Sequence, residues 1–270
     1  MTFSRCAAAC VAALAALGST AQARTICTAV ADATTGEFLV QRGNCKQRVT
    51  PASTFKLALS VMAFDNGFLT DAHTPTLAFQ PGYPDWGGEP WRQPTDATRW
   101  LHYSVVWFSQ QIARSLGEAR LHQYATDFGY GNADFSGDPG KHNGLERAWI
   151  ASSLKISPLE QLAFLRKLVN RQLPVSPRAL DMTLVIVETI PAAGGWTVQG
   201  KTGMAYPRLP NGEFDMAHPY GWFVGWAKQG ARTVVFARLI QDDKPEPGTA
   251  GVRARDALLA KLPRLAEARG

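Results

Sequence analysis

The sequence lacks the motifs of several common hydrolase classes. It contains no G-x-S-x-G, the strand–turn–helix motif that carries the nucleophile of α/β-hydrolases. Its histidines show no H-E-x-x-H or other metal-binding spacing. They are His73, His102, His122, His142 and His218. We therefore expect neither a hydrolase of that type nor a zinc enzyme, and no metal site.

Long apolar runs are also lacking beyond the N-terminus, so we expect no membrane-spanning helix. The first residues instead resemble a Sec-type signal peptide, with a short apolar run at 7–17 and a small-residue cleavage site at 21–23. A lipoprotein anchor at Cys10 is disfavoured because the apolar stretch before it is too short. We expect residues 1–23 to be a cleaved signal peptide and 24–270 to be a soluble periplasmic domain.

Charge of one sign is nowhere concentrated. Lysine and arginine number 28 against 22 acidic residues, giving a formal net charge of +6, but the two signs are interspersed. Nucleic-acid-binding domains usually gather their basic residues into a patch or stripe. We therefore expect no nucleic-acid partner, whereas the excess of cations favours an anionic small substrate.

Cysteine is scarce, with four residues in the chain. Removal of the signal peptide would take away Cys6 and Cys10 and leave Cys27 and Cys45. In an oxidising compartment this pair predicts a disulfide, worth about 3 kcal/mol in the chain-entropy model. Two buried free thiols are the alternative.

Strand-like segments lie at both ends of the chain and helix-like segments in the middle, which predicts a mixed α/β (α+β) fold. We expect the terminal strands to form one antiparallel sheet, covered by the first and last helices, and residues 71–190 to form a mainly helical lobe. Residues 71–99 read as a long ordered loop packed down by Trp86, Trp91 and Trp100. Strands are expected at 25–31, 37–41, 196–202, 222–227 and 233–240, and helices at 104–116, 118–128, 158–170, from 177, and at 252–266. The site would lie in the cleft between the lobe and the sheet.

The segment Pro51-Ala52-Ser53-Thr54-Phe55-Lys56 carries the clearest chemical signal. Pro51 suits the first turn of a helix, and the apolar period that follows ends at Asn66-Gly67. Ser53 would lie where free N–H groups and the positive helix end favour a developing anion. Lys56 would share its face, and a desolvated lysine can activate a serine.

Three further motifs follow in order: Ser104-Val105-Val106 near a helix start, Tyr130-Gly131-Asn132 in a turn, and Lys201-Thr202-Gly203 on a strand. S-x-x-K, S-D-N and K-T-G in this order are the signature of serine β-lactamases and penicillin-binding proteins. Here S-V-V replaces S-D-N. With Y-G-N, Trp149-Ile150 and the G-W-F-V-G-W segment at 221–226, the chain strongly resembles the class D serine β-lactamases, the oxacillinases, over nearly all of its mature length.

This resemblance implies a fold like that of the β-lactamases and penicillin-binding transpeptidases, and hydrolysis of β-lactam antibiotics through an acyl-enzyme. Ser53 resembles the nucleophile, and Lys56 resembles the lysine that CO2 converts into N6-carboxylysine, the general base. Ser104 would relay a proton to the departing lactam nitrogen. Val106 and Trp149 would support the carbamate. CO2 or bicarbonate would be needed for this modification, and no other cofactor.

The resemblance also implies the substrate contacts. Lys201 and Thr202 would lie beside the substrate carboxylate, and Arg253 resembles the arginine that binds it, with Arg255 near enough to be the alternative. Backbone N–H groups of Ser53 and Met204 would form the oxyanion hole. An acyl transfer needs this set of nucleophile, base, proton donor and oxyanion donors, which supports the assignment independently.

Two other functions share parts of this pattern. A D,D-peptidase of the same superfamily would transfer its acyl group to a peptide, but the short chain and S-V-V disfavour it. A β-lactam-sensing receptor domain would hold the adduct without turnover, and we would then expect membrane-spanning helices upstream. The partners we expect are small β-lactams. The sequence leaves open the preferred β-lactam and whether the chain is a monomer or a dimer.

Overall fold

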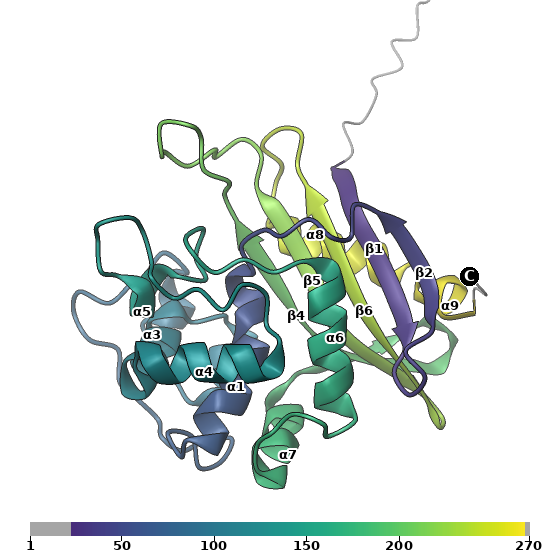
Figure 1. Cartoon of the computed structure of the whole chain (residues 1–270), viewed down its shortest axis with the longest axis horizontal. Coiled ribbons are helices and arrows are strands. Elements are labelled where there is room, and N and C mark those ends of the chain that lie inside the picture. Colours follow the sequence, from purple (N-terminus) through teal and green to yellow (C-terminus); the bar gives the residue numbers. More distant parts are fainter. Residues whose placement is uncertain (1–22, 268–270) are drawn as a thin grey trace, which may run out of the picture.

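The terminal segments of the chain pair in the middle of one sheet. The computed structural model describes residues 23–267, so the predicted signal peptide lies outside the described residues except for Ala23. The sheet is antiparallel and six-stranded, in the order β2-β1-β6-β5-β4-β3. Its strands are β1 (Arg24–Asp32), β2 (Phe38–Gly43), β3 (Thr189–Ala192), β4 (Trp196–Ala205), β5 (Tyr220–Gln229) and β6 (Arg232–Gln241). The predicted antiparallel sheet from both chain ends is confirmed (Figure 1).

The helices occupy both faces of this sheet and a separate lobe beside it (Figure 1). They are α1 (Phe55–Asp65), α2 (Ala97–His102), α3 (Val106–Leu116), α4 (Glu118–Phe128), α5 (Gly144–Arg147), α6 (Pro158–Val169), α7 (Pro177–Ile186), α8 (Ala250–Leu259) and α9 (Leu262–Glu267). Helix α8 packs on β4, β5 and β6, and α9 on β1 and β2, whereas α6 covers the other face. None of the described helices is long and apolar enough to cross a membrane.

The first helix does not cover the sheet as predicted. Helix α1 packs against α7 and α3 inside the lobe, and α6 takes its place on the sheet. The reason is that α1 carries apolar residues around its whole circumference and has no polar face to turn to solvent. It is accordingly buried at every residue from Phe55 to Phe64. The short 3-10 turn before it, Ala52–Thr54, packs on β4 and β5.

Several element ends agree with their local signals. Ser157 and Glu160 form the capping box expected at the start of α6, and α4 has the predicted bounds. The predicted helix at 252–266 is instead divided into α8 and α9. Pro263 accounts for the break, because proline lacks the N–H that would continue the helix and its ring clashes with the preceding turn.

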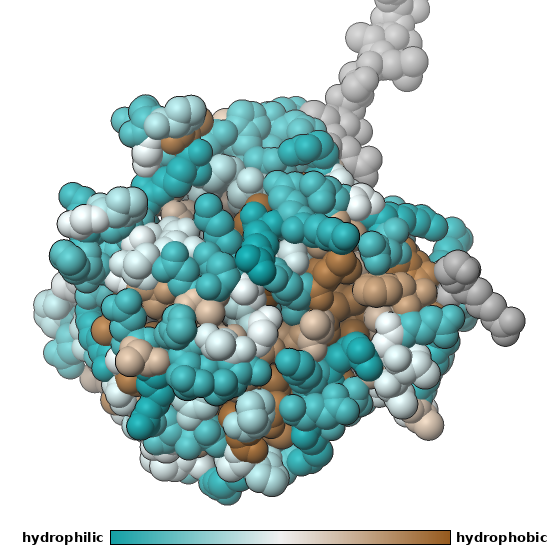
Figure 2. Space-filling view, viewed as in Figure 1, coloured by the Kyte–Doolittle hydropathy of each residue, from teal (hydrophilic) through white to brown (hydrophobic). Residues whose placement is uncertain are grey.

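The predicted disulfide is present and joins β1 to the turn after β2. The Sγ atoms of Cys27 and Cys45 are 2.03 Å apart. Figure 2 shows that hydrophilic residues cover most of the face seen in Figure 1, with hydrophobic ones mainly beside α6, over the outer strands β1 and β2.

Candidate active site

Ser53 lies in the 3-10 turn that leads into α1. Ala52 before it has a φ of +50°, in the left-handed region that residues with a Cβ seldom adopt. The backbone of β4 approaches this turn closely at Gly203, where a Cβ would lie 3.0 Å from the carbonyl oxygen of Pro51 and 3.3 Å from the amide nitrogen of Ser53. Glycine at position 203 therefore allows β4 to lie against the backbone N–H of Ser53.

Lys56 lies one turn further along, fully buried beneath Ser53. Its Nζ is 3.2 Å from Ser53 Oγ. Burial holds the pKa of the Lys56 amine well below its usual value, and the positive charge of Lys201 lowers it further. Both causes favour the neutral amine, which can accept a proton from Ser53 or react with CO2.

Ser104 approaches the same cavity from the turn between α2 and α3. Helix α3 begins at Val106 and not at Ser104 as predicted, and Ser104 itself has a φ of +57°. A cavity of about 220 Å³ opens beside Ser53. Its lining includes Ser53, Ser104, Val106, Trp149, Thr202 and Met204. The structure thus brings most of the predicted site residues together from four separate segments.

Trp149 is buried against α1, with its ring centroid 5.5 Å from that of Phe55. Within residues 23–267 its indole Nε1 finds no hydrogen-bond acceptor, although it is shielded from solvent. A buried indole N–H normally has a partner. This orphaned donor lies on the wall of the cavity that holds Ser53.

Lys201 lies on β4 in a second cavity, of about 480 Å³, which shares Thr202 with the first. Its Nζ donates to the carbonyl oxygen of Thr202 at 3.3 Å. Burial lowers the pKa of Lys201 from 10.5 to about 8, against the opposing influence of Glu188. The group is therefore a cation at neutral pH, held in a place where it gains from an anionic partner.

The two candidate arginines point in different directions. Arg253 donates to the carbonyl oxygen of Pro247 and pairs with the buried carboxylate of Asp242, and it lines neither cavity. Arg255 lines the larger cavity together with Lys201. Residues two apart on a helix lie about 200° apart around its axis, so only one of them can face the cavity.

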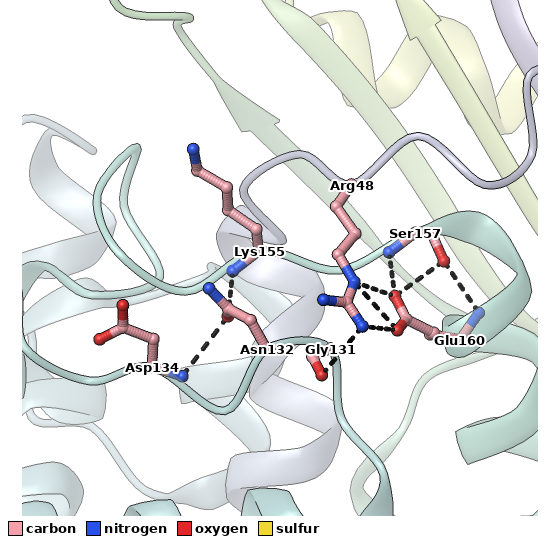
Figure 3. Close-up of polar contacts among 7 residues, drawn as sticks. All are labelled: Arg48, Gly131, Asn132, Asp134, Lys155, Ser157 and Glu160. Atoms are coloured by element: carbon pink, nitrogen blue, oxygen red, sulfur yellow. Dashed lines mark hydrogen bonds and ion pairs between the residues drawn. The ribbon is translucent and has the colours of Figure 1, made fainter.

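The Y-G-N motif organises the segment that leads away from Trp149 (Figure 3). Asn132 donates to the carbonyl oxygen of Ser153 at 2.9 Å and accepts from the amide of Lys155 at 2.8 Å. Arg48, next to the motif, pairs with Glu160 and donates to the carbonyl oxygen of Gly131 (Figure 3). These contacts hold the backbone of the Y-G-N turn and of the segment at 153–155 in place.

Sequence reasoning missed several residues at the site. Trp86 was expected to pack the 71–99 loop, but it is 62% exposed and lies on the rim of the smaller cavity, whereas Trp91 and Trp100 are buried as expected. Arg48 and Thr50 hydrogen-bond to residues about a hundred positions away in the chain, and no local sequence signal could have indicated these contacts. In the described part of the chain no three His, Cys, Asp or Glu side chains gather in a way that could hold a metal ion.

Comparison with known proteins gives consistent matches. The family model of the penicillin-binding protein transpeptidase domain matches residues 26–263. β-Lactamase OXA-9 of Klebsiella pneumoniae is 47% identical over 240 residues, which are 88% of this chain and 86% of the relative. β-Lactamase OXA-1 of Escherichia coli is 37% identical, over 79% of this chain and 75% of its own. The crystal structure of the class D β-lactamase OXA-427 is 44% identical and superposes with a TM-score of 0.83, covering 89% of this chain and 98% of that one.

Proposed function

The chain belongs to the class D serine β-lactamases, which hydrolyse β-lactam antibiotics through a serine acyl-enzyme, and we propose that Ser53, Lys56 and Ser104 carry out this reaction here. The observation that carries the proposal is the contact of 3.2 Å between Lys56 Nζ and Ser53 Oγ, with the lysine wholly buried. Such an arrangement lets the lysine side chain take the serine proton as the hydroxyl attacks.

The bonds formed and broken follow from these positions. The Ser53 hydroxyl gives its proton to the Lys56 side chain, and its oxygen bonds to the lactam carbonyl carbon. The N–H groups of Ser53 and Met204 bind the oxyanion, and each such donor is commonly worth about 3 kcal/mol. The C–N bond of the ring then breaks, while Ser104 passes its proton to the nitrogen and takes up the proton that the Lys56 side chain received from Ser53. Water then gives a proton to the freed Lys56 side chain and attacks the acyl carbon. The bond to Ser53 Oγ breaks, the proton returns from Lys56 to Ser53, and the ring-opened acid leaves.

The surroundings of Lys56 fit its carbamylation by CO2. The lowered pKa supplies the neutral amine that the reaction needs, and the orphaned Nε1 of Trp149 supplies a hydrogen-bond donor for a new oxygen. Val106 contributes apolar surface to the same cavity wall. The carbamate, when formed, supplies a carboxylate-like proton acceptor. We propose CO2 or bicarbonate as the single requirement besides substrate and water.

Burst kinetics with and without bicarbonate test this proposal. Enzyme depleted of CO2 at acidic pH should acylate and turn over slowly, and bicarbonate should restore part of both rates. Ser53→Ala should give no adduct by mass spectrometry, and Lys56→Ala should impair both steps. Full turnover of CO2-depleted enzyme at acidic pH would mean that Lys56 acts as a plain amine. An adduct that never turns over would indicate a β-lactam sensor, and transfer only to peptides a D,D-peptidase.

The substrate carboxylate is proposed to bind beside Lys201 and Thr202. Arg253 remains the arginine implied by family resemblance, and Arg255 is the one that lines the cavity. Arg253→Ala and Arg255→Ala distinguish the two, because loss of the carboxylate contact should raise KM with little change in kcat. Arg253→Ala should in addition lower stability, since it leaves the buried Asp242 carboxylate unpaired. If Arg255→Ala alone raises KM, the register taken from the resemblance is wrong.

Export to the periplasm is proposed from the N-terminal composition. Strand β1 begins at Arg24, directly after the predicted cleavage point, so cleavage there would leave the fold complete. N-terminal sequencing of mature protein should begin at Arg24.

A further inference from the structure

Thr50 is a buried residue just before the Ser53 turn, and it hydrogen-bonds both to the segment that carries Trp149 and to strand β5. Its Oγ1 donates to the carbonyl oxygen of Trp149 at 2.8 Å and accepts from the amide of Ala151 at 3.0 Å. Its own carbonyl oxygen accepts from the indole of Trp222, on β5, at 2.9 Å. Thr50 is 6% exposed and stands three residues before Ser53.

The hydroxyl of Thr50 hydrogen-bonds to the backbone on both sides of Ile150. Among the described residues, no other side chain hydrogen-bonds to the backbone of Trp149. The remaining anchors act further along: Arg208 donates to the carbonyl oxygen of Ala151 at 3.1 Å, and Asn132 holds residues after that. Ala151 has a φ of +52°, a strained conformation that needs such support.

We propose that Thr50 is a positioning residue for the modified form of Lys56. It acts by fixing the direction of the Trp149 indole N–H relative to the turn that carries Ser53. The proposal rests on carbamylation of Lys56. Thr50 touches neither substrate cavity, so its effect should appear in the stability of the carbamate and not in substrate affinity.

A pair of substitutions isolates the hydroxyl. Thr50→Val keeps the shape and removes both side-chain hydrogen bonds, whereas Thr50→Ser keeps the hydroxyl. Thr50→Val should raise the bicarbonate concentration for half-reactivation about fivefold, the factor that corresponds to one net hydrogen bond. The carbamate signal in 13C NMR with labelled bicarbonate should weaken in parallel, at unchanged KM. Thr50→Ser should behave like the wild type.

A control separates positioning from general loss of stability. Tyr124→Phe removes a hydrogen bond of 2.8 Å to Asp65, in the helical lobe. It should lower the melting temperature and leave the bicarbonate dependence unchanged. If Thr50→Val and Tyr124→Phe change the bicarbonate dependence equally, or if neither changes it, the proposal is wrong.

A measurement on the wild type avoids any folding defect of the variants. Coupling between two sites is reciprocal, so carbamylation of Lys56 should strengthen the contact between Thr50 and the Ala151 amide. Bicarbonate should therefore slow hydrogen exchange at Ala151. If Ala151 exchanges at the same rate with and without bicarbonate, in a sample whose carbamate signal is present, the role of Thr50 is wrong but the carbamylation of Lys56 still stands. Absence of any carbamate signal in the wild type would overturn the proposed carbamylation, and the role of Thr50 with it.

Discussion

Replacement of Lys201 by methionine should stabilise the protein while impairing its function. The Lys201 ammonium is buried, and within the described residues its Nζ has one hydrogen-bond partner, the carbonyl oxygen of Thr202. Burial lowers its pKa from 10.5 to about 8. Because the folded-state pKa is lower than the unfolded one, the charge destabilises the native state fully below about pH 8. This cost shrinks between pH 8 and 10.5 and vanishes above that range.

The magnitude follows from the two pKa values. A pKa of about 8 in place of 10.5 corresponds to about 3 kcal/mol at pH 7. Lys201→Met removes this cost and also loses a hydrogen bond worth about 1 kcal/mol, so the net gain should be about 2 kcal/mol. For a domain of this size that gain raises the melting temperature by roughly 4–8 °C. At the same time KM for β-lactams should rise, because the larger cavity keeps Arg255 but loses the cation proposed to lie beside the substrate carboxylate.

Urea unfolding at pH 7 and at pH 10 measures the effect. The advantage of Lys201→Met over the wild type should be clear at pH 7 and should largely disappear by pH 10. Lys228→Met, at an exposed position on β5, is the matched control and should change stability little at either pH. A variant no more stable than the wild type at pH 7, or an advantage equal at both pH values, would refute the reasoning.

Three further outcomes are expected. Reduction of the Cys27–Cys45 bond, which spans a sequence separation of 18, should lower stability by about 3 kcal/mol and be visible as an earlier thermal transition; an unchanged transition would count against it. Trp149→Phe keeps a ring but lacks the indole N–H, so bicarbonate dependence should increase and acyl-enzyme should accumulate in mass spectra, whereas wild-type behaviour would exclude a role for that N–H. Gly203→Ala should reduce kcat roughly 10-fold, because the added Cβ would displace the Ser53 turn by a few tenths of an ångström and a misplacement of about 1 Å can cost about 100-fold; an unaffected kcat would show that the turn tolerates the added Cβ.

Local signals were sufficient for most of the elements. The Ser157–Glu160 capping box and the proline after Ser157 predicted α6 because these residues satisfy free N–H groups within a single turn. Strand β3 was missed, and its first two residues were assigned to the helical lobe. Its four residues, Thr189–Ala192, include a proline and lie at the sheet edge. They form a strand because β4 is available to pair with them, and their own sequence carries little strand signal.

The grouping of the candidate site residues was easier to predict than the direction of each side chain. The S-x-x-K spacing predicted that Ser53 and Lys56 lie together, because residues three apart near a helix start share a face, and Lys56 Nζ is 3.2 Å from Ser53 Oγ. The direction of Arg253 depends instead on where α8 begins and how it packs on the sheet. A helix that turns 100° per residue sends Arg253 toward Asp242 and leaves Arg255 in the cavity, and no local pattern sets that phase.

The region around Ser53 contains strained backbone conformations and buried amines, both of which cost folding free energy. Ala52, Ser104 and Ala151 all have φ values between +50° and +57°, each costing of order 1–3 kcal/mol. Lys56 and Lys201 add two buried amines, and the charge of Lys201 makes protonation of Lys56 still less favourable. Substrate would relieve part of this cost, since a carboxylate beside Lys201 pairs with its buried charge, and CO2 would react with the neutral amine that burial of Lys56 already favours. Substrate binding should therefore stabilise the folded protein by more than it would at a site without a buried charge. This added stabilisation should be lost in Lys201→Met, because the buried charge of Lys201 is then absent, although Arg255 still lines the larger cavity.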